Sequence, residues 1–168
     1  MKFLKSFLIL SVVCWQMLRA DALPENTLKA AYLYNFALLT DWPKGDKSEN
    51  FNLCFFRENL GTASDVLQNK TLHNQKLKVL TVTNAQEAKE CKMLFIPESE
   101  EQRGEKVIQK LAGTPVLVIT ENMSFADTHI MIVRDNRKLA FDVNLQTFKN
   151  TDLDVSSRLL KLARKVEP

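Results

Sequence analysis

The chain has 168 residues, of which 45% are hydrophobic and 26% charged, and its formal net charge is +3. Lys2, Lys5, Arg19 and Asp21 contribute +2 of this total, so residues 23–168 carry only +1. A domain this close to neutral has no general electrostatic attraction for nucleic acid or anionic lipid, and we expect no nucleic-acid partner.

The first 22 residues have the pattern of a secretory signal peptide. Two lysines precede an apolar run from Phe7 to Leu18, which is too short to cross a bilayer because a spanning helix needs roughly 20 residues. Ala20-Asp21-Ala22 then matches the small-residue cleavage pattern. We therefore predict export with cleavage near Ala22, and one domain over residues 23–168 that does not itself span the membrane.

Two of the three cysteines, Cys54 and Cys91, lie in the predicted exported domain. Paired thiols in an oxidising compartment are candidates for a disulfide, which here would close a long loop. The alternative is two buried thiols that lie too far apart to bond. A bond between them would join two predicted strands and would be structural or regulatory.

The domain begins with a predicted helix. Apolar residues recur at helical spacing over about Thr27 to Asp41, and Asn26 is a suitable cap. The helix should end before Trp42-Pro43, because a residue that precedes proline is disfavoured in the helical region.

Four strands and three helical segments follow in alternation. The strands are predicted at residues 51–57, 77–83, 92–96 and 115–120, with helical segments at 60–69, 85–89 and 98–111 between them. This order predicts an α/β fold with a mostly parallel sheet flanked by helices, of the Rossmann-like kind.

The C-terminal part has a different pattern. Two apolar runs, 130–133 and 138–143, flank Asp135-Asn136, a spacing typical of an antiparallel hairpin. A terminal helix is predicted to begin near Ser156 or Ser157, both of which are suitable caps.

Residues with catalytic chemistry do not form a recognisable motif. The sequence has no nucleophile elbow, dinucleotide fingerprint or phosphate-binding loop. His73 and His129 are far apart and outside any Cys/His cluster, so we predict neither a metal nor a cofactor, and no enzymatic activity. Trp42 has two interpretations: it packs in the core, or it lines a ligand pocket or partner surface.

Several segments in order resemble the YfiR-like family of periplasmic proteins. They are residues 28–36 followed by Trp42-Pro43, Cys54 in its strand, Cys91 ahead of residues 93–96, residues 115–117, residues 141–144 and residues 156–163. The resemblance runs from about residue 27 to residue 164. It implies a periplasmic α/β domain that often dimerises.

The resemblance also implies a function by binding. The best-understood members repress a membrane-bound diguanylate cyclase by binding its periplasmic sensor domain, and reduction of a disulfide releases that block. Cys54 and Cys91 stand where the family has paired cysteines. Trp42, His129 and Arg158 are then the candidate partner- or ligand-binding residues.

One departure from the family pattern bears on this function. His129 and Ile130 stand where the family usually has Gly-Gly, which indicates a remodelled surface. We therefore keep a second hypothesis, a periplasmic small-ligand-binding protein with no cyclase partner.

Overall fold

The computed structural model describes residues 23–44, 48–68, 70–136 and 138–168. The predicted signal peptide and its cleavage site lie outside these residues. Within them, no helix combines the length and the apolar character needed to cross a membrane.

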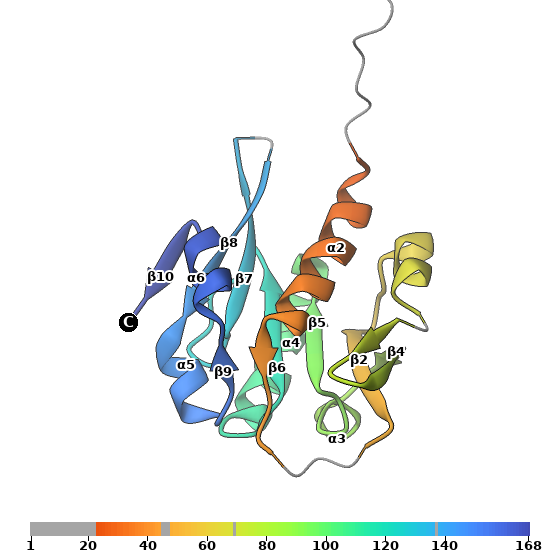
Figure 1. The fold of residues 1–168 in the computed structure, drawn as a ribbon. Helices are drawn as coiled ribbons and strands as arrows, with labels where there is room; N and C mark the ends of the chain where they lie inside the picture. The colour runs from red at the N-terminus through yellow and green to blue at the C-terminus, as the bar shows by residue number, and fades with distance from the viewer. Residues whose placement is uncertain (1–22, 45–47, 69, 137) are drawn as a thin grey trace, which may run out of the picture.

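An eight-stranded sheet forms the centre of the domain (Figure 1). Its strands, in spatial order, are β10 (Lys165–Glu167), β8 (Lys138–Asn144), β7 (Ile130–Asp135), β6 (Leu117–Glu121), β5 (Met93–Ile96), β2 (Asn50–Phe56), β4 (Gln75–Val82) and β3 (Thr71–Leu72). The pairs β4–β2, β2–β5, β5–β6, β6–β7 and β8–β10 are parallel. The pairs β7–β8 and β3–β4 are antiparallel. The protein is thus a mixed α/β single domain with a mostly parallel sheet.

The central strands are apolar because both of their faces are covered. All four residues of β5 are buried, as are the first four of β6. Such continuous burial is characteristic of parallel strands packed between two layers of helices. This explains why residues 93–96 and 117–120 could be assigned as strands from composition alone.

Helices cover the sheet on two sides. On one side lie α2 (Glu25–Leu38), the 3₁₀ helix η1 (Gly61–Leu67), α5 (Leu145–Asn150) and α6 (Ser157–Leu162), which share a hydrophobic core with the sheet. On the other side α3 (Ala85–Ala88) and α4 (Glu101–Leu111) form a second core. A short 3₁₀ helix, η2 (Glu98–Glu100), precedes α4. In Figure 1, α2 crosses in front of the strands and α4 lies behind them.

A second, two-stranded sheet connects the two ends of the domain. Strand β1 (Thr40–Asp41) follows α2 directly and pairs antiparallel with β9 (Asp154–Val155). The amide of Ser156 then donates a hydrogen bond to the carbonyl of Leu39 at 2.9 Å. The start of α6 is thereby fixed to the end of α2, although more than a hundred residues separate them in the sequence.

The first helix is shorter than its pattern predicts. It ends at Leu38, not Asp41, because Thr40 and Asp41 enter the pairing with β9. The predicted cap at Asn26 is wrong: Pro24 is the N-cap residue, and the Asn26 amide instead lies 3.5 Å from the carbonyl of Leu60.

The C-terminal part also differs from the prediction. Ser156 caps α6 by accepting from the amide of Arg158, as expected, but the chain then continues into β10 and does not end in a helix. Helix α5 was not predicted, although Asn144 caps it through a hydrogen bond from the amide of Thr147. Both missed elements are too short to show a periodic pattern.

Candidate functional site

A disulfide joins Cys54 to Cys91 within the second core, with their Cα atoms 6.0 Å apart. The predicted pairing is confirmed, but the bond does not join two strands. Cys54 lies in β2, while Cys91 lies in the turn between α3 and β5. Cys54 is fully buried and Cys91 is 5% exposed, so the latter lies nearer the surface.

Helix α3 positions Cys91. Its N-cap is Asn84, whose side chain accepts from the amide of Glu87 at 3.0 Å. The carboxylate of Glu87 in turn accepts from the amide of Thr83 at 2.7 Å, and this hydrogen bond lowers the pKa of Glu87. These reciprocal contacts resemble a capping box and fix a helix that is only one turn long. The turn that carries Cys91 therefore has a defined place beside β2.

A cleft of about 450 Å³ opens next to the disulfide, at the amino ends of β2, β5 and β6. Its lining residues are Ser48, Asn50, Asn52, Lys89, Glu90, Cys91, Lys92, Thr114, Pro115 and Val116. The volume lies within the range of small-molecule sites in proteins. The lining offers amide, hydroxyl, ammonium and carboxylate groups, which can form hydrogen bonds with a polar ligand or a peptide.

Hydrogen bonds within the lining hold the cleft in shape. The amide of Asn52 donates to the carbonyl of Glu90 at 3.0 Å, which connects β2 to the turn of Cys91. The hydroxyl of Thr114 donates to the carbonyl of Leu111 at 2.6 Å and closes the end of α4.

Trp42 lies behind two walls of this cleft. Its indole Nε1 lies 3.2 Å from the carbonyl oxygen of Lys92 and 3.1 Å from that of Pro115, and donates to both. Its ring meets Phe51 edge to face, with centroids 5.0 Å apart. Trp42 is half-buried, so it packs against the core and also fixes the segments that begin β5 and β6. It is not among the lining residues.

His129 immediately precedes β7 and is buried, with 1% of its surface exposed. Its Nδ1 accepts from the amide of Val118 at 3.1 Å, so Nε2 must carry the proton and donate to the hydroxyl of Thr151 at 2.8 Å. Burial lowers the pKa of His129 to about 3. The ring is therefore neutral at physiological pH, and both of its nitrogens are already hydrogen-bonded.

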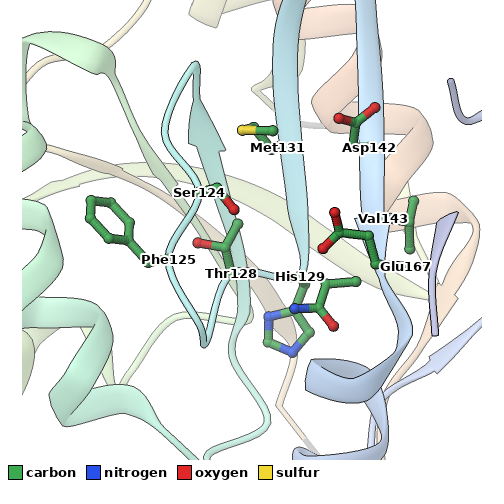
Figure 2. A pocket seen from close by; sticks show the side chains of 9 residues that line it. Ser124, Phe125, Thr128, His129, Met131, Asp142, Val143 and Glu167 are labelled. Carbon is green, nitrogen blue, oxygen red and sulfur yellow. The ribbon is translucent and has the colours of Figure 1, made fainter. Parts of the chain in front are cut away.

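A second, much smaller hollow lies beside His129 (Figure 2). Ser124 and Thr128 approach it from the loop between β6 and β7, and Met131 and Asp142 from the neighbouring strands. Its volume is about 20 Å³, room for about one water molecule. This hollow is too small to be a ligand site of its own.

Arg158 lies in the first turn of α6 and is exposed. Its element follows β9, whose partner β1 directly precedes Trp42. Of the predicted site residues, only Cys91 lines the cleft. Trp42 lies behind its wall, against the carbonyls of Lys92 and Pro115, and His129 and Arg158 are outside the lining. Sequence reasoning missed Asn50, Asn52 and Thr114, since single polar residues at separate strand starts give no joint signal.

The fold and the site define the class of protein: an α/β domain with a disulfide next to a polar cleft, which lies at the amino ends of the central strands. The chain belongs to the YfiR/HmsC-like family, whose model matches residues 26–164. The family that the segments around Trp42-Pro43 and residues 156–163 indicate is thereby confirmed. A search of curated proteins found no match.

Proposed function

We propose that the protein is a periplasmic regulatory protein that acts by binding and performs no chemistry on a substrate. In this proposal residues 1–22 are removed on export, and residues 23–168 inhibit an inner-membrane signalling protein such as a diguanylate cyclase. Membership of the YfiR/HmsC-like family supports it, since the best-understood members act in this way.

The observation that carries the proposal in this chain is the position of the disulfide. The Cys54–Cys91 bond fixes the turn that forms one wall of the cleft. Breaking it would release this wall from β2 and alter the surface around it. A partner that contacts this surface would then respond to the redox state of the periplasm. We propose that Trp42 supports the wall of the cleft and that Arg158 adds a cationic contact with the partner. His129 would act indirectly, by holding β6 and α5 in place through Val118 and Thr151.

The first test is the cellular level of cyclic-di-GMP. Deleting the gene should raise the level, and supplying the wild-type protein should lower it again. A variant with Cys54→Ser and Cys91→Ser should fail to lower it although the protein accumulates in the periplasm. An unchanged level after deletion would contradict inhibition of a cyclase.

The second test identifies the contact surface. A photo-crosslinking residue placed at Lys89, in the cleft, should capture an inner-membrane protein in living cells. The matched control is the same residue at Glu105, an exposed position on α4 outside the lining. Capture from Glu105 but not from Lys89 would place the partner elsewhere.

The size and polarity of the cleft favour a second candidate function, the binding of a small ligand without a protein partner. A ligand that binds only the folded protein raises its melting temperature. A screen of polar metabolites should then find a compound that raises Tm for the wild type but not for Asn52→Leu. If deletion of the gene leaves the level of cyclic-di-GMP unchanged and this screen finds such a compound, the second function is favoured over the first.

A further inference from the structure

Strands β2 and β4 form a polar face beside the cleft. Side chains alternate between the two faces of a strand, so Asn50 and Asn52 lie on the same face of β2 as Cys54, which belongs to the second core. The parallel register places Lys76 of β4 beside Asn50, and it places Lys78 beside Asn52. Since both asparagines line the cleft, its surface continues onto β4 through the two lysines.

This surface is positively charged. Lys76, Lys78 and, in the cleft itself, Lys89 are exposed, and no carboxylate of the described residues forms an ion pair with any of the three. Among the described residues, the lining holds one carboxylate, that of Glu90. Residues 23–168 are nearly neutral as a whole, so the charge is a local feature. Such a surface is complementary to an anionic partner.

The spacing of the two lysines on β4 favours an extended partner. Lys76 and Lys78 lie on the same face of the strand, about 6.6 Å apart along it. Carboxylates at every second residue of an extended chain repeat at the same spacing. Leu80 continues the row on this face, and its side chain is large, apolar and 40% exposed. A segment with two alternate carboxylates followed by an apolar residue would match all three positions.

The outer margin of β4 is closed to a further strand. The amide of Leu77 donates to the carbonyl of Lys70 at 2.7 Å. The side-chain amide of Gln68 accepts from the N–H of Val79 at 3.2 Å and donates to its carbonyl at 3.4 Å. These contacts occupy backbone groups that an added strand would need. An extended partner is therefore expected to lie across the face that carries the lysines, and not along the margin.

We propose that the cleft and the adjoining face of β4, with Lys76, Lys78 and Leu80, bind an acidic, extended segment of the membrane partner. This inference rests on the function proposed above and adds the chemistry of the contact, which is alternate carboxylates and an apolar residue. The disulfide lies next to this face, since Cys54 is beside Leu80 in the register. Its reduction would therefore disturb the same contact.

Photo-crosslinking in living cells tests this contact. A crosslinking residue placed at Leu80 should capture an inner-membrane protein, and mass spectrometry should find it attached to a segment with two carboxylates at alternate positions. Adding Lys76→Glu and Lys78→Glu should reduce the yield about tenfold or more, because two attractive contacts become repulsive. The control is Lys106→Glu with Lys149→Glu, the same charge change at exposed positions outside this surface, which should leave the yield unchanged.

Neutral substitutions separate the effect of charge from an effect on folding. Lys76→Gln with Lys78→Gln should reduce the yield less than charge reversal does, while every variant accumulates in the periplasm with its disulfide intact. No capture from Leu80, attachment to a segment without carboxylates, or a yield that charge reversal leaves unchanged would overturn the proposal. Capture through an acidic segment of a protein that has no signalling domain would support this surface and contradict the regulatory function instead.

Discussion

The imidazole Nε2 of His129 lies 2.8 Å from the hydroxyl oxygen of Thr151, which in turn lies 2.9 Å from the carbonyl oxygen of Thr147. Because Nδ1 of the same ring accepts from Val118, the histidine connects β6 to α5 through a short chain of hydrogen bonds. The ring also meets Phe148 edge to face, with centroids 4.9 Å apart. A neutral ring is required throughout, since Nδ1 must remain an acceptor.

This requirement predicts a loss of stability in mild acid. The folded protein keeps His129 neutral down to a pKa of about 3, whereas the unfolded chain takes up a proton near its ordinary value of 6.5. The unfolded state therefore binds more protons as the pH falls below 6.5, and stability decreases with it. Between pH 7.5 and pH 5 this one group should cost about 2 kcal/mol of the free energy of unfolding, measured by urea denaturation.

His129→Gln is the control for this pH dependence. Glutamine can still donate to Thr151 but has no proton to gain, so the variant should be less stable than the wild type at pH 7.5. Its stability should, however, change little between pH 7.5 and pH 5. If both proteins lose stability equally over this interval, the acid sensitivity does not come from His129.

The disulfide should contribute much of the stability of the domain. Residues 54 and 91 are 37 positions apart. A cross-link over a loop of this length lowers the conformational entropy of the unfolded chain, which raises the free energy of the unfolded state by about 4 kcal/mol at 25 °C. The double substitution Cys54→Ala and Cys91→Ala should reduce the free energy of unfolding by about this amount. Guanidinium denaturation, with and without reductant, measures it. Reductant should destabilise the wild type and leave the double variant unchanged.

Much of the sheet could be predicted from the sequence because its central strands are buried on both faces. Runs such as residues 93–96 contain only apolar side chains, and their alternation with helical segments indicates parallel pairing. The β10 strand could not be predicted, since Lys-Val-Glu at residues 165–167 gives no strand pattern. It is held at the sheet by the bidentate contact of Arg164 with Asp142, 22 positions earlier.

The cleft was beyond prediction for a related reason. Its walls come from residues near 50, 90 and 115, which meet only because β2, β5 and β6 are neighbours in the sheet. Strand order is not encoded in any local pattern. Trp42 was recognised as a candidate because of its position before a proline. Its double contact with the carbonyls of Lys92 and Pro115 depends on that same strand order.

Gly104 on α4 should not tolerate a side chain. A Cβ atom added at this position would lie 2.6 Å from Cγ2 of Ile96, a fully buried residue of β5. Gly104→Ala would gain helix propensity but force α4 away from the sheet. We expect a net loss of about 1–3 kcal/mol in thermal or urea unfolding, because overpacking of a dense core is destabilising.

A second substitution distinguishes this collision from other effects of alanine. Ile96→Ala removes the methyl group that is too close, and alone it should be destabilising because it leaves a cavity. In the Ile96→Ala background, Gly104→Ala should cost less than it does in the wild type, and it can become stabilising. Strictly additive losses in the double variant would contradict the packing explanation.

Lys29 should be essential for the position of α2. Its ammonium contacts the carboxylates of Glu121 at the end of β6 and of Glu25, the latter at 2.8 Å, and the side chain is 8% exposed. Burial acts to lower the pKa of Lys29, but the hydrogen bonds with Glu121 and Glu25 outweigh this effect and raise it. The amine therefore remains charged across the physiological range.

Lys29→Met should destabilise the protein by about 3 kcal/mol, since it leaves the nearly buried carboxylate of Glu121 without its partner. Adding Glu121→Gln should recover part of the loss, because the uncompensated charge is then removed. Lys106→Met, at an exposed position on α4, is the matched control and should change the free energy of unfolding by less than about 0.5 kcal/mol. Urea denaturation of the four proteins completes the comparison, and equal effects at positions 29 and 106 would show that the contact with Glu121 does not hold α2 in place.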